Sequence, residues 1–109
     1  MQYDYMPDKW ALLHIQDDPN EICQYRIISG WHGGYLGSDE WRISSGITNV
    51  IEHRHFYEIH NASGSTYKCY KKNYGFTSYT AEILIRYKKM ENIQVLNDIK
   101  DLPTRCFGG

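Results

Sequence analysis

Aromatic and basic residues interleave in one segment, residues 67–89. Proteins that bind single-stranded nucleic acid combine cations, which follow the phosphates, with aromatic rings, which stack on the bases. The leading hypothesis is therefore binding of RNA or single-stranded DNA with modest sequence specificity. The residues assigned to phosphate are Lys68, Lys71 and Lys72, and those assigned to base stacking are Tyr70 and Tyr74. The competing interpretation is a charged surface that only keeps the protein in solution.

Three of the five histidines lie just before this segment, at His53, His55 and His60. Residues two apart in a strand point the same way, so His53 and His55 could share a metal ion. Glu52 or Glu58 would lie nearby as a further ligand. The spacing matches no established metal-binding motif. Because an exposed hairpin tip with unrelated histidines explains the pattern as well, we expect no metal and no other cofactor.

Residues suited to catalysis are present, but no catalytic motif surrounds them. Asp39 and Glu40 are adjacent, and adjacent residues of a strand point to opposite faces, so they make a poor acid–base pair. Cys69 could pair with a histidine as nucleophile and base, yet no nucleophile-elbow signature is present. The run Gly30–Gly37 lacks the GxxxxGK[ST] pattern of a phosphate-binding loop. We therefore predict that the protein is not an enzyme.

A second functional hypothesis comes from the stretch Ser29–Gly46, which holds two of the three tryptophans and five of the nine glycines. Glycine permits tight connections, and tryptophan offers a large apolar surface. The stretch predicts two strands joined by a tight loop and pinned by the two indoles. Aromatic surfaces of this kind dominate protein interfaces, so the alternative function is a protein-interaction module. The residues assigned to that surface are Trp31, Tyr35, Leu36 and Trp41.

Composition places further limits on the protein. A chain of 109 residues indicates one domain, residues 1–109. The net charge of −1 excludes a global field that would drive binding to nucleic acid or membrane, although residues 52–90 carry three acids and seven bases. Cys23, Cys69 and Cys106 form no CxxC pair, which favours reduced thiols in a cytoplasm, with Cys23 and Cys69 as small core residues. We expect no membrane span and no signal peptide.

Alternating apolar residues predict a series of short strands. In the first strand Ala11, Leu13 and Ile15 share one face, with Trp10 and Leu12 on the other. The strands are expected at residues 9–16, 22–32, 40–51, 56–60, 66–71 and 92–96. Gly46, inside the long third strand, predicts a bulge or a sharp bend. An ordered arm or a short turn is expected at the N-terminus, and a loose tail is expected from Leu102 onward.

Residues 79–90 fit two patterns, because they alternate like a strand and also carry a helical stripe of Ile83, Tyr87 and Met90. Their composition and a cap at Thr77 or Ser78 favour a helix. We therefore predict a mainly β, α+β fold: a small antiparallel barrel or strongly bent sheet of about five strands, similar to SH3, Sm or OB barrels, with one C-terminal helix. An open sheet with one helix on a face is the alternative, and its free edges would favour a homo-oligomer.

Two runs of residues resemble a known group of proteins. They are Gly30-Trp31-x-Gly33-Gly34-Tyr35-Leu36-Gly37-Ser38-Asp39-x-Trp41-Arg42-x-x-Ser45-Gly46-Ile47 and Ser63-Gly64-Ser65-x-Tyr67-x-Cys69-x-Lys71-x-x-Tyr74-Gly75. Across about residues 23–80 the chain resembles small uncharacterised proteins of marine cyanophages and ocean metagenomes. The resemblance implies an Sm-like barrel, a ring of subunits with RNA or DNA contact, and a location in the host cytoplasm.

Overall fold

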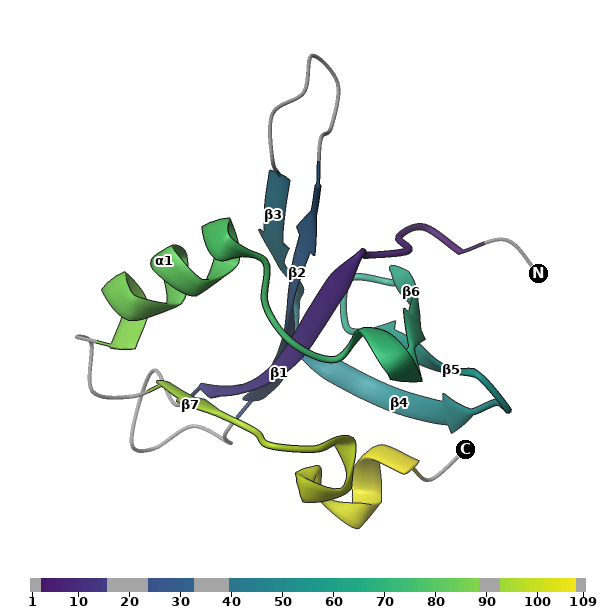
Figure 1. Cartoon of the computed structure of the whole chain (residues 1–109). Coiled ribbons are helices and arrows are strands. Elements are labelled where there is room, and N and C mark those ends of the chain that lie inside the picture. The colour runs from purple at the N-terminus through teal and green to yellow at the C-terminus, as the bar shows by residue number, and fades with distance from the viewer. Residues whose placement is uncertain (1–2, 16–23, 33–39, 89–92, 108–109) are drawn as a thin grey trace.

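The computed structural model describes residues 3–15, 24–32, 40–88 and 93–107 (Figure 1). They form seven strands, one α-helix and short 3-10 turns. The strands are β1 Lys9–Ile15, β2 Gln24–Trp31, β3 Glu40–Ile43, β4 Ile47–Glu52, β5 Phe56–Asn61, β6 Thr66–Tyr70 and β7 Ile93–Val95. The helix is α1, Ser78–Lys88, and the 3-10 turns are Lys71–Asn73, Ile99–Asp101 and Thr104–Phe107. No helix in this part of the chain is long and apolar enough to cross a membrane.

Strand β1 is the centre of the structure because both of its faces are buried. It lies between β2 and β7 in an antiparallel sheet of order β3-β2-β1-β7. Ala11, Leu13 and Ile15 pack with Ile28 and Leu84 on the side of α1. The opposite face carries Trp10 and Leu12 into a larger core shared with the second sheet. The predicted division of this strand into two apolar faces is therefore confirmed.

The second sheet has the order β4-β5-β6, and both of its connections are hairpins. Ile59, Tyr67 and Cys69 point inward and are almost completely buried. The N-terminal arm lies along the free edge of β6, where Tyr5 forms a parallel bridge with Tyr67. The backbone N–H of Lys68 donates to the carbonyl of Tyr5 at 2.9 Å. The expected ordered arm is thus present, and it covers one edge of the sheet.

The predicted long strand at residues 40–51 is divided into β3 and β4, which belong to different sheets. The chain bends at residues 44–46, where the Ser44 hydroxyl accepts a hydrogen bond from the N–H of Ile27 at 2.9 Å. The sharp bend expected at Gly46 is confirmed. The prediction of a single strand over residues 40–51 is wrong, because two strands form there. Beyond the bend, the pairing of β4 with β5 has an irregular register. Val50 lies in the core there, and Ile51 is 37% exposed.

Helix α1 confirms the choice of helix over strand for residues 79–88, and the last two residues of the predicted helix, 89–90, lie outside the described residues. Thr77 precedes it and forms a reciprocal cap, because its hydroxyl accepts from the N–H of Thr80 at 3.0 Å. The Thr80 hydroxyl in turn accepts from the N–H of Thr77 at 2.9 Å. This exchange satisfies backbone donors that the first helical turn leaves free. The helix lies in the middle of the order of elements, followed by β7, so its predicted C-terminal position is wrong.

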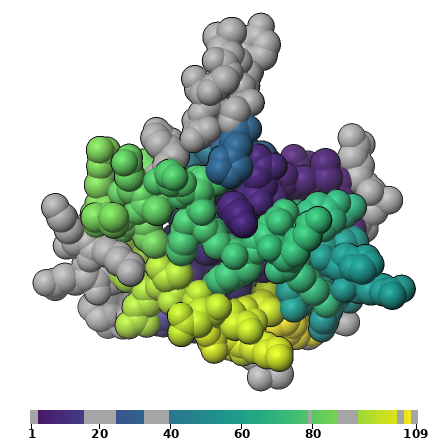
Figure 2. Space-filling model, in the orientation of Figure 1, coloured from purple at the N-terminus to yellow at the C-terminus, as the bar shows by residue number. Residues whose placement is uncertain are grey.

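Two other fold predictions need correction. The described strands form two antiparallel sheets and no closed barrel, so only the coarser prediction of a mainly β fold with one helix holds. The tail is not loose, because Ile99, Leu102 and Cys106 are buried in the core beside Val50. Figure 2 shows the C-terminal residues, in yellow, packed against the green segment that follows β6. Cys69 is a buried core thiol as expected, whereas Cys23 lies outside the described residues.

Candidate nucleic-acid interface

The second sheet has one buried face and one face on which most side chains are half-exposed. We call the latter the open face, and define it by Phe56, Glu58 and His60 of β5 together with Thr66, Lys68 and Tyr70 of β6. The register pairs Phe56 with Tyr70 and Glu58 with Lys68, so these side chains lie directly opposite one another. Alternation along the two strands brings aromatic, basic and histidine side chains to one surface.

Lys68 lies at the centre of a group of aromatic rings on the open face. Its ammonium nitrogen is 4.7 Å from the ring centroid of Phe56 and 5.3 Å from that of Tyr70. Tyr3, from the N-terminal arm, adds a third ring at 5.7 Å. Ring faces attract a cation through their quadrupole, so the three rings hold the ammonium at the surface. Among the described residues Lys68 makes no ion pair.

Glu58 explains why Lys68 has no carboxylate partner, although the two residues are paired across the strands. The Glu58 side chain is nearly buried, and both of its oxygens accept hydrogen bonds. His60 Nε2 donates to Oε2 at 2.6 Å, and His53 Nε2 donates to Oε1 at 3.0 Å. The Tyr3 hydroxyl also donates to Oε1, at 3.2 Å. The histidines and the tyrosine therefore satisfy this carboxylate, and the ammonium of Lys68 remains available.

The hydrogen bond from His60 is the main reason that the pKa of Glu58 lies below its ordinary value. Burial opposes this effect, whereas the hydrogen bonds from His53 and Tyr3 and the charge of His60 add to it. A lowered carboxyl pKa stabilises the fold above the pKa of the unfolded chain, and this stabilisation is lost as the pH falls through the folded value. We therefore expect Glu58→Gln to cost about 1 kcal/mol at pH 6. The difference from the wild type should shrink below about pH 4.5, as urea denaturation at both pH values would measure. A difference that grows on acidification would contradict this assignment.

The predicted histidine cluster is only partly assembled. His53 and His60 meet at Glu58, but His55 is exposed in the β4–β5 turn and takes no part. The His53 ring stacks on Phe56, with centroids 4.4 Å apart and planes inclined by 15°. Within the described ranges no group of three or more histidine, cysteine, aspartate or glutamate side chains is arranged to hold a metal ion. His53 and His60 instead lie beside the aromatic side chains of the open face, where both contact Glu58.

The five residues assigned to nucleic acid from sequence do not all share this surface. Lys68 and Tyr70 lie on the open face, and Lys72 is exposed just beyond it. Lys71 is paired with Glu52 at 2.6 Å and lies 5.1 Å from the ring centroid of Tyr57. Tyr74 is fixed at the core, where its hydroxyl donates to the carbonyl of Leu96. The same hydroxyl accepts from the N–H of Leu12 at 3.2 Å, and burial is the main reason that the pKa of Tyr74 is raised.

The tryptophans of the alternative surface lie on β2 and β3. Trp31 is half-buried, and its indole N–H donates to the carbonyl of Met6 at 3.1 Å, so it fixes the N-terminal arm. Trp41 is also half-buried and is paired with Gly30 across the strands. Tyr35 and Leu36 lie outside the described residues. The structure therefore gives Trp31 a role within the fold.

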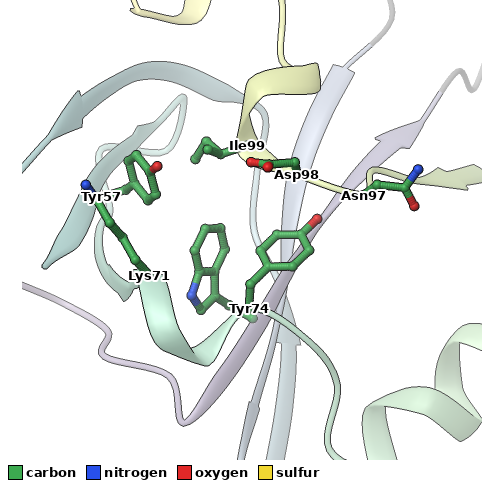
Figure 3. A pocket seen from close by; sticks show the side chains of 7 residues that line it. Tyr57, Lys71, Tyr74, Asn97, Asp98 and Ile99 are labelled. Carbon is green, nitrogen blue, oxygen red and sulfur yellow. The ribbon is translucent and has the colours of Figure 1, made fainter.

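A small pocket lies where the end of β6 meets the C-terminal segment (Figure 3). Its volume is about 170 Å³. Three aromatic residues line it, together with Lys71, Asn97, Asp98 and Ile99; the aromatic ones are Trp10, Tyr57 and Tyr74. Burial is the main reason that the pKa of Tyr57 is raised, and nearby Glu52 and Asp98 raise it further. The pocket therefore combines ring surfaces with a carboxylate.

Comparisons with models of protein families, with curated proteins and with solved structures found no match to this chain. The expected kinship with cyanophage proteins and with Sm-like barrels therefore stays a prediction.

Proposed function

We propose that the protein binds single-stranded nucleic acid, RNA or DNA, on the open face and does so without catalysis. The observation that supports this proposal best is the ammonium of Lys68, held among three rings and free of ion pairs in the described part of the chain. A nucleic-acid strand offers a phosphate for such a cation and bases for the rings around it. The exposed Lys72 and Arg54 lie at the border of the same surface and add positive charge there.

The rings on the open face are arranged for stacking. Phe56 and Tyr70 are half-exposed, with centroids 6.2 Å apart and planes inclined by 63°. An exposed antiparallel sheet holds such rings on a rigid surface, so little conformational entropy is lost when a strand binds. Stacking on each ring would stabilise binding by about 1–3 kcal/mol and would tolerate any base. This tolerance fits the modest specificity expected from the sequence.

Lys68→Met should weaken binding of a fluorescently labelled single-stranded oligonucleotide by about tenfold and reduce the dependence of affinity on salt by about one counterion. Methionine keeps the length and packing of the side chain while removing the charge. Fluorescence anisotropy over a salt series measures both effects, and light scattering on the same samples tests the proposed homo-oligomer. Tyr70→Ala should weaken binding by a similar factor at every salt concentration, because it removes a stacking surface.

The matched control is Lys100→Met, since Lys100 is an exposed lysine in the C-terminal 3-10 turn and away from the open face. It should bind like the wild type. Equal losses for Lys68→Met and Lys100→Met would show that only overall charge matters. Absence of binding at low salt would overturn the proposal and direct attention to a protein partner at the surface that includes Trp31 and Trp41.

A further inference from the structure

The pocket beyond the end of β6 has a volume and lining residues that suit a single planar ring. Its volume of about 170 Å³ lies below the range of about 300–1,000 Å³ typical of sites for drug-sized ligands and cofactors. The ring of Trp10 meets those of Tyr74 and Tyr57 edge to face, at centroid distances of 4.8 and 6.1 Å. Figure 3 shows Tyr57 and Tyr74 on opposite sides of the space. A planar ligand could stack against either tyrosine ring.

The polar groups of the pocket favour a ligand that donates hydrogen bonds. The Trp10 N–H and the Tyr74 hydroxyl are already engaged by the carbonyls of Tyr70 and Leu96. The Asp98 carboxylate accepts from the N–H of Lys100, to Oδ1 at 3.2 Å, and from the N–H of Asp101 in the capping box. It can accept further hydrogen bonds, because a carboxylate offers about four acceptor positions. Figure 3 shows this carboxylate directed toward the space between Tyr57 and Tyr74. The Asp98 carboxylate is therefore the strongest acceptor in the wall, and the Tyr57 hydroxyl beside it can donate or accept.

The charges of the pocket disfavour an anionic ligand. The ammonium of Lys71 is neutralised by Glu52 at 2.6 Å, so the carboxylate of Asp98 is the uncompensated charge among the lining residues. A phosphate or carboxylate group would be repelled from such a site. A neutral ring with an amino group on its edge would be accepted, because carboxylates accept hydrogen bonds from exocyclic amino groups of bases.

We infer that this pocket holds one nucleobase with an exocyclic amino group, and that it discriminates against uracil and thymine. The inference rests on the proposed function in one respect: the base would belong to the strand that lies on the open face. The pocket lies on the other side of the second sheet from the open face, because Tyr57 in its wall alternates along β5 with Phe56 and Glu58. To reach it, the strand would pass round the end of β6, where Lys72 is exposed, and turn one base into the pocket.

Cytosine and uracil form the sharpest test, because the two rings are alike in size and differ along one edge. At position 4 cytosine carries an amino group and uracil a carbonyl oxygen, and at position 3 cytosine accepts a hydrogen bond whereas uracil donates one. Wild-type protein should bind labelled oligo-C at least about fivefold more tightly than oligo-U of equal length. Asp98→Asn should abolish that preference, because the amide presents a donor as well as an acceptor. The substitution should preserve the fold, since asparagine is as good a helix cap as aspartate.

Asp101→Asn is the matched control. Asp101 belongs to the same capping box, where its Oδ2 accepts from the N–H of Asp98 at 3.3 Å, but it does not line the pocket. This variant should keep the preference for cytosine. Equal affinity of the wild-type protein for oligo-C and oligo-U, with binding still dependent on Lys68, would overturn the base pocket and leave the proposed function standing.

A titration with free cytidine and uridine tests the pocket independently of strand binding on the open face. The indole N–H of Trp10 donates to the carbonyl of Tyr70 at 2.7 Å and so reports on the pocket wall by NMR. Cytidine, and not uridine, should shift this signal in the wild type and leave it unchanged in Asp98→Asn. If no oligonucleotide binds but cytidine shifts the signal, the pocket stands and the proposed function fails. If neither oligonucleotide nor cytidine has an effect, both are wrong.

Discussion

Replacing Trp10 by alanine is expected to lower the free energy of unfolding by about 3–5 kcal/mol, which is a large part of the stability of a domain this size. The indole is only 1% exposed and lies on the central strand, at the junction of β1, β6 and the C-terminal segment. Alanine would leave a cavity between the rings of Tyr57 and Tyr74. Urea denaturation followed by circular dichroism would measure the loss.

Trp10→Phe separates packing from hydrogen bonding. Phenylalanine retains a ring but leaves the carbonyl of Tyr70 without the indole N–H, which now lies 2.7 Å away. An unsatisfied buried acceptor costs about 1–3 kcal/mol, and this partly buried carbonyl should cost less, so the variant should fall between the wild type and Trp10→Ala. If Trp10→Ala unfolds at the same urea concentration as the wild type, Trp10 does not hold the two sheets together.

Gly30→Ala is expected to cost about 1–3 kcal/mol and to disturb the contact between α1 and β2. A methyl group at Gly30 would lie 2.8 Å from Cγ2 of Thr80 and 2.9 Å from Cγ2 of Thr77. Gly30 is held on both sides by pairing with Lys9 and Trp41, so its backbone cannot withdraw. The helix must shift instead, which strains the reciprocal threonine cap. Thermal unfolding would measure the cost.

Further substitutions test whether contact with the two threonine methyl groups causes the loss of stability in Gly30→Ala. Thr77→Ser and Thr80→Ser remove both methyl groups and keep the hydroxyls that form the cap. Adding them to Gly30→Ala should recover most of the lost stability, although each serine alone is expected to be neutral or slightly destabilising. Failure of the combined variant to recover would show that the close approach of the helix is not the reason for glycine at this position.

Local patterns in the sequence predicted the elements of the fold better than their arrangement. Alternation placed Ala11, Leu13 and Ile15 on one face, and the structure buries that face under α1. The composition of residues 79–90 and the cap at Thr77 correctly favoured a helix. Both predictions succeeded for the same reason: the alternation of side chains along a strand and the capping of a helix depend on residues that are close in sequence.

The failures arose where distant contacts decide the structure. Alternation continues through residues 40–51, yet the hydrogen bond from Ile27 to Ser44 lies at a bend that places the two halves in different sheets. The tail from Leu102 onward shows no strong period, yet Leu102 and Cys106 fill the core beside Val50. Nothing local distinguishes such a segment from a solvated one, since its burial depends on a surface formed elsewhere.

The candidate site was predictable in part. The alternation of Thr66, Lys68 and Tyr70 along β6 placed the last two on one face, and the structure has them there. Phe56 was missed, although the hairpin turn fixes a register that sets it opposite Tyr70. Tyr3 could not be found from sequence, because its contact with Lys68 depends on an arm that crosses from the other end of the chain.

The position of β1 between β2 and β7 has a consequence for the order in which the protein is made. A ribosome releases the chain from its N-terminus, so β1 and β2 emerge early and can pair as a hairpin. The partner of Leu13 in β7 is Val95, and the core beneath Trp10 is closed by Ile99 and Leu102. The second sheet and α1 can cover part of the two apolar faces of β1 as they emerge, but these faces are fully enclosed only once β7 and the 3-10 turns after it have been made.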